Sequence, residues 1–78
     1  MKLSRHARNN IRLYKILETD IIETINAPDL NDREGDKLIA IKKFTDKYSG
    51  YPLKVVYKRV KGEEIVITSY PLKKNHWR

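Results

Sequence analysis

Residues 53–70 read LKVVYKRVKGEEIVITSY and give the clearest indication of secondary structure in the chain. Val, Ile, Tyr and Thr dominate two runs, 53–60 and 64–70, which flank the turn-forming pair Lys61 and Gly62. β-Branched and aromatic residues favour strands, and a short turn with Gly between two such runs is typical of a hairpin. The stretch therefore predicts two antiparallel strands joined by a tight turn.

The register of this hairpin depends on the length of its turn. A two-residue turn places Lys54 opposite Ser69, whereas a three-residue turn places Lys54 opposite Tyr70, and the sequence leaves both registers open. Residues 37–44 have the same strand-forming composition and predict a third strand. We expect the three strands to form one antiparallel sheet.

Two helices are predicted ahead of the sheet. Ser4 suits the N-cap of a helix over residues 4–15, whose apolar positions recur at helical spacing. Thr19 or Asp20 suits the cap of a second helix over residues 20–27. The N-terminal part of the chain is therefore expected to be helical.

Between the helices and the strands, the polar segment 29–36 is rich in turn-forming residues and predicts an exposed loop. The pattern as a whole favours one α+β domain over residues 1–78. In it, two N-terminal helices pack on one face of a three-stranded, or slightly larger, antiparallel sheet and leave the other face available. A basic tail, 71–78, completes the domain.

Length and composition exclude several classes of protein. A chain of 78 residues buries only about 60% of its unfolded surface, which makes a marginal core. The absence of cysteine excludes disulfides and thiolate metal sites and fits a reducing compartment. No apolar run is long enough to span a bilayer. We expect a soluble cytoplasmic protein without a metal, a cofactor or a membrane partner.

Charge is sorted along the chain into three blocks. Residues 1–17 carry a net charge of +5, residues 18–36 carry −6, and residues 37–78 carry +8. Two basic blocks around an acidic one predict that the two ends of the chain meet in space and form one electropositive surface opposite the acidic segment. Nucleic acid is the first partner to expect for such a surface.

The first helix carries a cationic row with no acid before Glu18. Arg5, Arg8 and Arg12 recur at helical spacing, so they share one face, and an ordinary solvated face is the alternative interpretation. The basic tail offers cations for phosphates and a ring for stacking on a base, in Lys73, Lys74, Trp77 and Arg78. Packing of the Trp ring over the sheet is the alternative there.

The residue inventory also matches metal-independent RNA cleavage. In that reaction a base takes a proton from the 2′-hydroxyl, cations hold the dianionic transition state, and an acid protonates the leaving oxygen. His6 and Tyr70 are the candidates for proton transfer, and Lys42, Lys54 and Arg59 are the candidates for holding the phosphate.

Several short motifs resemble a known family, and they occur in its order and spacing across nearly the whole chain. They are Ser4 to Ala7 at the start of a helix, Asn26 to Asp29, Pro52 to Tyr57, Ile65 to Pro71, and Trp77. Together they resemble the domain of unknown function 4258 family, which is similar to BrnT and RelE toxins of bacterial toxin–antitoxin pairs. The resemblance implies a RelE- or barnase-like layout, ribonuclease activity, RNA (including ribosome-bound mRNA) as substrate and an acidic antitoxin as partner. It favours His6, Lys54, Tyr70 and Trp77 as site residues.

Two functional hypotheses follow. The first is a small basic RNA-binding protein that acts as a metal-independent endoribonuclease of toxin type. The alternative is a non-catalytic nucleic-acid-binding or protein-interaction module, which needs only the basic surface. The first requires His6, Tyr70 and two cations to converge in the folded domain.

Overall fold

The fold is described by a computed structural model that covers residues 1–73. Along the chain its elements are β1 (Lys2–Leu3), α1 (Arg5–Tyr14), α2 (Glu18–Asn26), β2 (Leu30–Glu34), β3 (Lys37–Lys42), the 3₁₀ turn η1 (Tyr48–Gly50), β4 (Leu53–Val60) and β5 (Glu63–Pro71). The two helices and the three long strands lie within two residues of the predicted ranges. The α+β class is confirmed.

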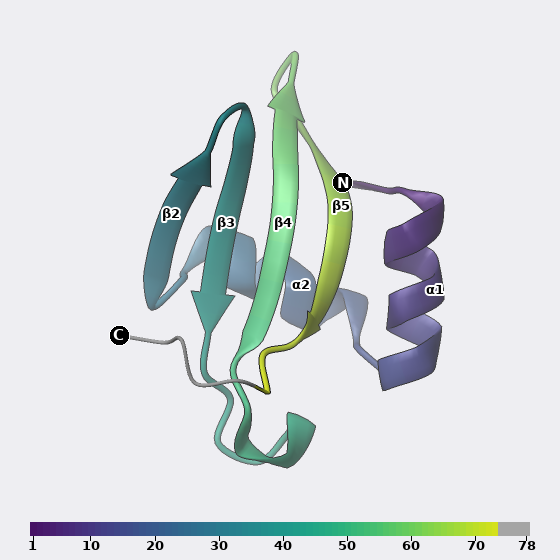
Figure 1. The fold of residues 1–78 in the computed structure, drawn as a ribbon, viewed down its shortest axis with the longest axis vertical. Helices are drawn as coiled ribbons and strands as arrows, with labels where there is room; N and C mark the ends of the chain where they lie inside the picture. Colours follow the sequence, from purple (N-terminus) through teal and green to yellow (C-terminus); the bar gives the residue numbers. More distant parts are fainter. Residues whose placement is uncertain (74–78) are drawn as a thin grey trace.

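The sheet differs from the predicted one in size and in direction. Its five strands follow the order β1-β5-β4-β3-β2, and β1 runs parallel to β5 while the other pairs are antiparallel (Figure 1). The sheet is therefore mixed, with a predicted antiparallel centre and two additional edge strands.

The predicted loop 29–36 is wrong, because residues Leu30–Glu34 pair with β3 as strand β2. Four of the five residues of β2 are exposed, so no apolar alternation marks this strand in the sequence. Gly35, with φ of +63°, begins the two-residue turn from β2 to β3 and has the positive φ that such hairpin turns require.

The hairpin of β4 and β5 combines the two alternatives that the sequence left open. Its turn has two residues, Lys61 and Gly62, both with positive φ as in a type I′ turn. A bulge at Ile67 in β5 then shifts the register by one residue, so Lys54 pairs with Tyr70.

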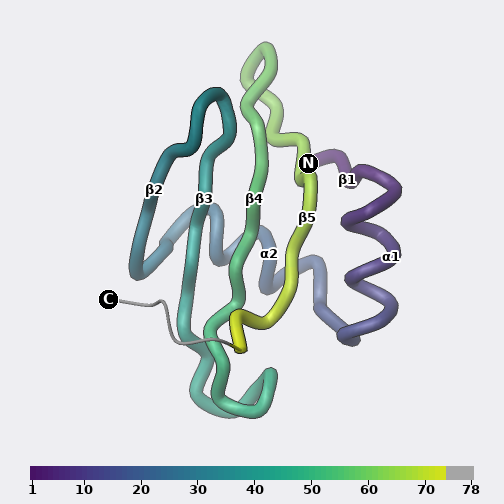
Figure 2. The backbone as a smooth tube through the Cα atoms, viewed as in Figure 1, coloured from purple at the N-terminus to yellow at the C-terminus, as the bar shows by residue number. Residues whose placement is uncertain are grey.

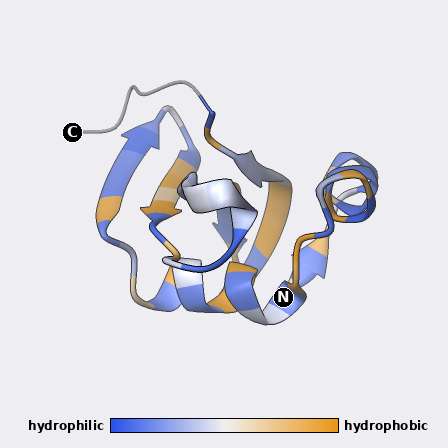
Figure 3. Cartoon of the chain, turned by 90° about the horizontal axis from the view of Figure 1, so that it is seen from below, coloured by the Kyte–Doolittle hydropathy of each residue, from blue (hydrophilic) through white to orange (hydrophobic). Residues whose placement is uncertain are grey.

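The helices lie at different places on the sheet. Helix α2 covers one face and packs against β3 and β4, whereas α1 runs beside β5 at the edge of the sheet (Figure 1). Seen down its axis in Figure 3, α1 is a separate and largely hydrophilic coil. The core between the helices and the sheet contains Ala7, Ile16, Ile21, Ile25, Ala40, Phe44, Leu53, Val55, Tyr57 and Val66.

This arrangement brings the basic first helix beside the last strand of the described chain. The backbone passes from β1, which is paired with β5, directly into α1, which also packs against β5 (Figure 2). The acidic strand β2 lies at the opposite edge of the sheet. The acidic β2 is thus separated from α1 by the width of the sheet, whereas the acids of α2 lie over β3 and β4, and Glu63 of β5 pairs with the N-terminal ammonium.

Candidate nucleic-acid interface

Helix α1 is held in one orientation by hydrogen bonds to β5. The Ser4 hydroxyl caps the helix by accepting from the Ala7 amide at 3.0 Å, and it donates to the Ile67 carbonyl at 2.6 Å. Two turns later, Nδ2 of Asn10 donates to Oγ1 of Thr68 at 3.0 Å. Because Ala7 is fully buried against the sheet, the opposite side of the helix faces outward.

The outward side of α1 carries the predicted cations. With about 100° of rotation per residue, Arg5, Arg8 and Arg12 lie about 100–160° around the axis from Ala7. All three are exposed, as is Lys15, which ends the helix in a left-handed conformation. We call these four residues the basic ridge, which is about 15 Å long at 1.5 Å per residue.

The basic ridge has no acidic partner within the described part of the chain, since no carboxylate there lies within 4 Å of its four cations. Five other cations are paired: Lys2 with Glu63, Lys42 with Glu23, Lys47 with Asp20, Lys58 with Asp36, and Arg59 with Glu64. Six more in the described residues have no acid within 4 Å but do not form a row on one helix: Arg33, Lys37, Lys43, Lys54, Lys61 and Lys73. The first turn of α1 contains no acid, although a helix N-terminus favours negative charge. The ridge is thus free for an external anion.

A hollow lies at the C-terminal end of α1, and its Tyr14 is on the same side of the helix as the buried Ala7. This tyrosine hollow has a volume of about 250 Å³ and is lined by Tyr14, Tyr48, Ser49, Tyr51, Pro71 and Lys73. A second depression beside it shares Tyr14, Tyr48 and Ser49 and adds Lys15, Leu17 and Lys47. No carboxylate lines either depression among the described residues.

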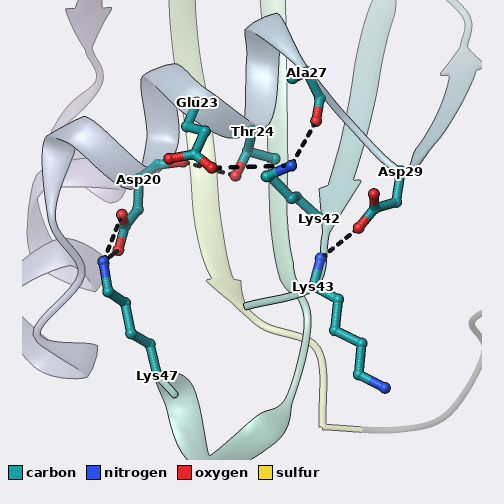
Figure 4. A network of polar contacts seen from close by, with 8 residues as sticks. All are labelled: Asp20, Glu23, Thr24, Ala27, Asp29, Lys42, Lys43 and Lys47. Carbon is teal, nitrogen blue, oxygen red and sulfur yellow. Dashed lines mark hydrogen bonds and ion pairs between the residues drawn. The ribbon is translucent and has the colours of Figure 1, made fainter. Parts of the chain in front are cut away.

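A left-handed turn forms one wall of the tyrosine hollow. Tyr48, Ser49 and Gly50 have φ of +56°, +55° and +82°, and this conformation costs roughly 1–2 kcal/mol for each residue other than glycine. The buried carboxylate of Asp20 holds the turn, because it accepts from the Tyr48 hydroxyl at 2.6 Å and from Nζ of Lys47 at 3.0 Å. The contact of Asp20 with Lys47 is drawn in Figure 4.

The Asp20 carboxylate therefore does not have the predicted capping role. Helix α2 begins at Glu18, with Leu17 at the N-cap position and no side-chain cap. Asp20 lies inside the first turn of the helix, and its carboxylate reaches the η1 turn. Burial and the hydrogen bond to Asp20 raise the pKa of Tyr48 to about 12.

Lys54 and Tyr70, two of the predicted catalytic residues, are neighbours. They pair directly across β4 and β5 on the sheet face away from α2, which we call the open face, and Nζ of Lys54 lies 5.6 Å from the centroid of the Tyr70 ring. On the same face, Lys58 forms an ion pair with Asp36 at 3.2 Å and holds the pKa of Asp36 below its usual value.

Two other predicted phosphate-holding residues lie on the opposite face of the sheet. Nζ of Lys42 donates to the Ala27 carbonyl at 3.0 Å, at the end of α2 (Figure 4). Arg59 lies near the hairpin turn and pairs with Glu64 at 3.3 Å. Successive side chains of a strand point to opposite faces of the sheet, so Arg59 and Lys54 lie on different faces. They are also five residues apart along β4, which corresponds to about 17 Å of extended strand.

His6 is exposed in the first turn of α1. It lies about 100° around the axis from Ala7, on the side opposite Arg8. The preceding Ser4 is bonded to Ile67, and the strand from Ile67 to Tyr70 adds about 10 Å along β5. His6 is therefore next to Arg5 but lies on a different side of the helix from Arg8 and Arg12, and the structure does not bring it together with Tyr70.

Only one of the four predicted tail residues belongs to the described part of the chain. Lys73 is exposed, and its Nζ lies 5.9 Å from the centroid of the Tyr14 ring. Lys74, Trp77 and Arg78 lie outside the described residues. Sequence reasoning missed Tyr14 and Tyr51 as site residues. The run Lys47, Tyr48, Ser49, Gly50 and Tyr51 was a usable signal for Tyr51, whereas Tyr14 had the spacing of a buried helix position.

Comparison with protein-family models, with curated proteins and with solved structures finds no match to this chain. The resemblance to the domain of unknown function 4258 family therefore stays a prediction. Among residues 1–73, no group of three or more His, Cys, Asp or Glu side chains could hold a metal ion. In the same part of the chain, no helix is long and apolar enough to cross a bilayer.

Proposed function

We propose that this protein is a nucleic-acid-binding module that holds the phosphate backbone of RNA along the basic ridge. The observation that carries the proposal is the row of four exposed cations on α1 with no acidic partner in the described residues. Arg5 stands at the helix N-terminus, where the helix dipole disfavours a cation by roughly 0.3–1 kcal/mol. Arg5 therefore lowers the stability of α1 while it adds to the positive charge of the ridge.

Charge separation across the molecule supports the same proposal. The acids of β2 lie at the edge of the sheet farthest from α1, so an approaching polyanion meets the ridge first. Each phosphate contact with a single strand contributes about −0.7 to the slope of the logarithm of the binding constant against the logarithm of the salt concentration. Four such contacts therefore predict a slope of about −3.

The test compares two triple variants of equal charge. Arg5, Arg8 and Arg12 are changed to Gln in one, and the exposed Arg33, Lys37 and Lys43 are changed to Gln in the control. The ridge variant should bind a short labelled RNA about 100-fold more weakly at about 0.1 M salt, with a slope shallower by about 2. The control should change affinity less than about threefold. Equal losses in both variants, or retention of an acidic protein and no RNA, would count against the proposal.

A second candidate, RNA cleavage, is favoured by one observation: the adjacent Lys54 and Tyr70 on the open face. A cation beside a phenol can hold a phosphate and move a proton, but a general base must also lie within about 3 Å of the 2′-hydroxyl. Incubation of naked and ribosome-bound RNA with EDTA tests this candidate. Cleavage by the wild-type protein that Tyr70→Phe abolishes would establish it, and intact RNA in both samples would exclude it.

A further inference from the structure

We propose that the tyrosine hollow binds one unpaired nucleobase and thereby selects single-stranded over double-stranded nucleic acid. This inference rests on the proposed function, and it adds a second site to the ridge. The hollow of about 250 Å³ is smaller than the range of about 300–1,000 Å³ that is typical for drug-sized ligands. It has room for one flat ring system, and the adjacent depression of about 400 Å³, which shares Tyr14, Tyr48 and Ser49, has room for the flanking part of the strand.

The two outer tyrosines of the hollow offer aromatic surface to a ligand. Tyr14 is 37% exposed and Tyr51 is 39% exposed, whereas Tyr48 forms the fixed wall because its hydroxyl is bonded to Asp20. Exposed aromatic rings beside cations are the usual stacking platforms for single strands, and stacking tolerates any base because every base has a π-face.

The charge around the hollow indicates that the ring it binds belongs to an anion. Lys73 lies over the Tyr14 ring, Lys15 lies at the rim of the adjacent depression, and no carboxylate among residues 1–73 lines either depression. A base that enters the hollow while its flanking phosphates contact Lys15 and Lys73 accounts for both the aromatic lining and the positive charge. An aromatic side chain of an acidic protein satisfies the same chemistry without following the ridge.

The position of the hollow decides between these two occupants. Lys15, the last cation of the ridge, lines the depression that shares Tyr14 with the hollow, whereas Tyr14 itself lies about 160° around the helix axis from Arg12. A strand whose phosphates follow the ridge therefore reaches Tyr14 by passing around the end of α1 at Lys15. A base inside a duplex is paired and stacked on both sides and does not offer a free face. The ridge therefore binds either form of nucleic acid, and the hollow adds affinity only for an unpaired base.

The left-handed η1 turn explains how the hollow stays open without a ligand. Tyr48 and Ser49 adopt a strained backbone that the Asp20 carboxylate holds in place. Such strain persists only where the surroundings enforce it, and it is concentrated at binding sites. The Tyr48 wall is therefore preformed, so binding orders fewer groups.

The experiment measures the affinity of the full chain for three probes at one salt concentration: a single-stranded RNA, the same sequence as a blunt duplex, and the same strand with abasic sites. Wild-type protein should bind the single strand about 10-fold more tightly than the other two probes. Tyr51→Ala should remove this difference without changing duplex binding, and Tyr51→Trp should preserve it. Leu13→Ala, an exposed change on α1 outside the hollow, is the matched control and should have no effect.

The outcomes separate this inference from the proposed function. If the ridge variant loses duplex binding while Tyr51→Ala changes nothing, the ridge function stands and the base site is refuted. Equal effects of Tyr51→Ala on all three probes also refute it. If wild-type protein binds none of the probes, both proposals fail together.

Discussion

Asp20 is the residue on which the shape of the tyrosine hollow depends. Its side chain is 4% exposed, and it accepts hydrogen bonds from the Lys47 ammonium and the Tyr48 hydroxyl. A buried carboxylate is tolerated only when it is paired in this way. Removal of the carboxylate leaves the Tyr48 hydroxyl and the Lys47 ammonium without their acceptor, and it releases the strained turn.

Asp20→Ala should therefore lower the free energy of unfolding by about 2–3 kcal/mol, below the roughly 3–5 kcal/mol for a fully buried pair because Lys47 is partly exposed. Urea denaturation followed by circular dichroism measures the change. Asp46→Ala, which removes an exposed acid from the same connection, should change stability by less than about 0.5 kcal/mol. Equal stability of the two variants would show that the network contributes nothing.

The Tyr48 hydroxyl makes stability depend on alkaline pH. Its pKa is about 12 in the folded protein, whereas an unfolded tyrosine ionises near about 10, so the unfolded chain loses this proton first. The stabilisation from this group is complete below about pH 10 and is lost as the pH rises towards about 12. The unfolding free energies of wild type and Tyr48→Phe should therefore differ by a constant amount at neutral pH and converge above about pH 10. Parallel curves throughout would contradict the assignment.

Among the elements, the turn between β4 and β5 contains a residue that does not favour the backbone conformation of the turn. Lys61 adopts φ of +51°, a conformation that type I′ turns usually give to Asn or Gly. Lys61→Asn should stabilise the protein by about 0.5–1 kcal/mol, as measured by thermal unfolding. Lys61→Gln removes the same charge without favouring positive φ, so an equal gain in that control would attribute the effect to charge alone.

The same elements show how far the sequence predicts the structure. Strands β4 and β5 are rich in β-branched and aromatic residues and flank a turn with Gly, so their composition and turn were sufficient to locate them. Strand β2 is exposed along nearly its whole length, and the bulge at Ile67 has no local signature, so neither could be predicted. The ridge followed from helical spacing, whereas the hollow depends on tyrosines from separate elements that only the fold brings together.

At the scale of the whole molecule, a net charge of +7 is distributed unevenly across a small domain. The acidic β2 lies at the far edge of the sheet from α1, and no acid in the described residues forms an ion pair with the ridge cations, so their mutual repulsion is not offset by direct pairing. Repulsion of this kind destabilises the compact state and is screened by salt. A basic surface that served only to stabilise the fold would instead be paired with acids.

The ridge variant with Arg5, Arg8 and Arg12 changed to Gln should therefore be at least as stable as wild type. At low ionic strength we expect a gain of about 0.5 kcal/mol, because the dipole penalty at Arg5 and the mutual repulsion are both relieved. Thermal unfolding with and without added salt measures this gain, which should shrink as salt screens the charges. Added RNA should raise the melting temperature of wild type and not of the variant, because a ligand stabilises only the folded state that binds it. Loss of stability in the variant would instead assign the ridge to the fold.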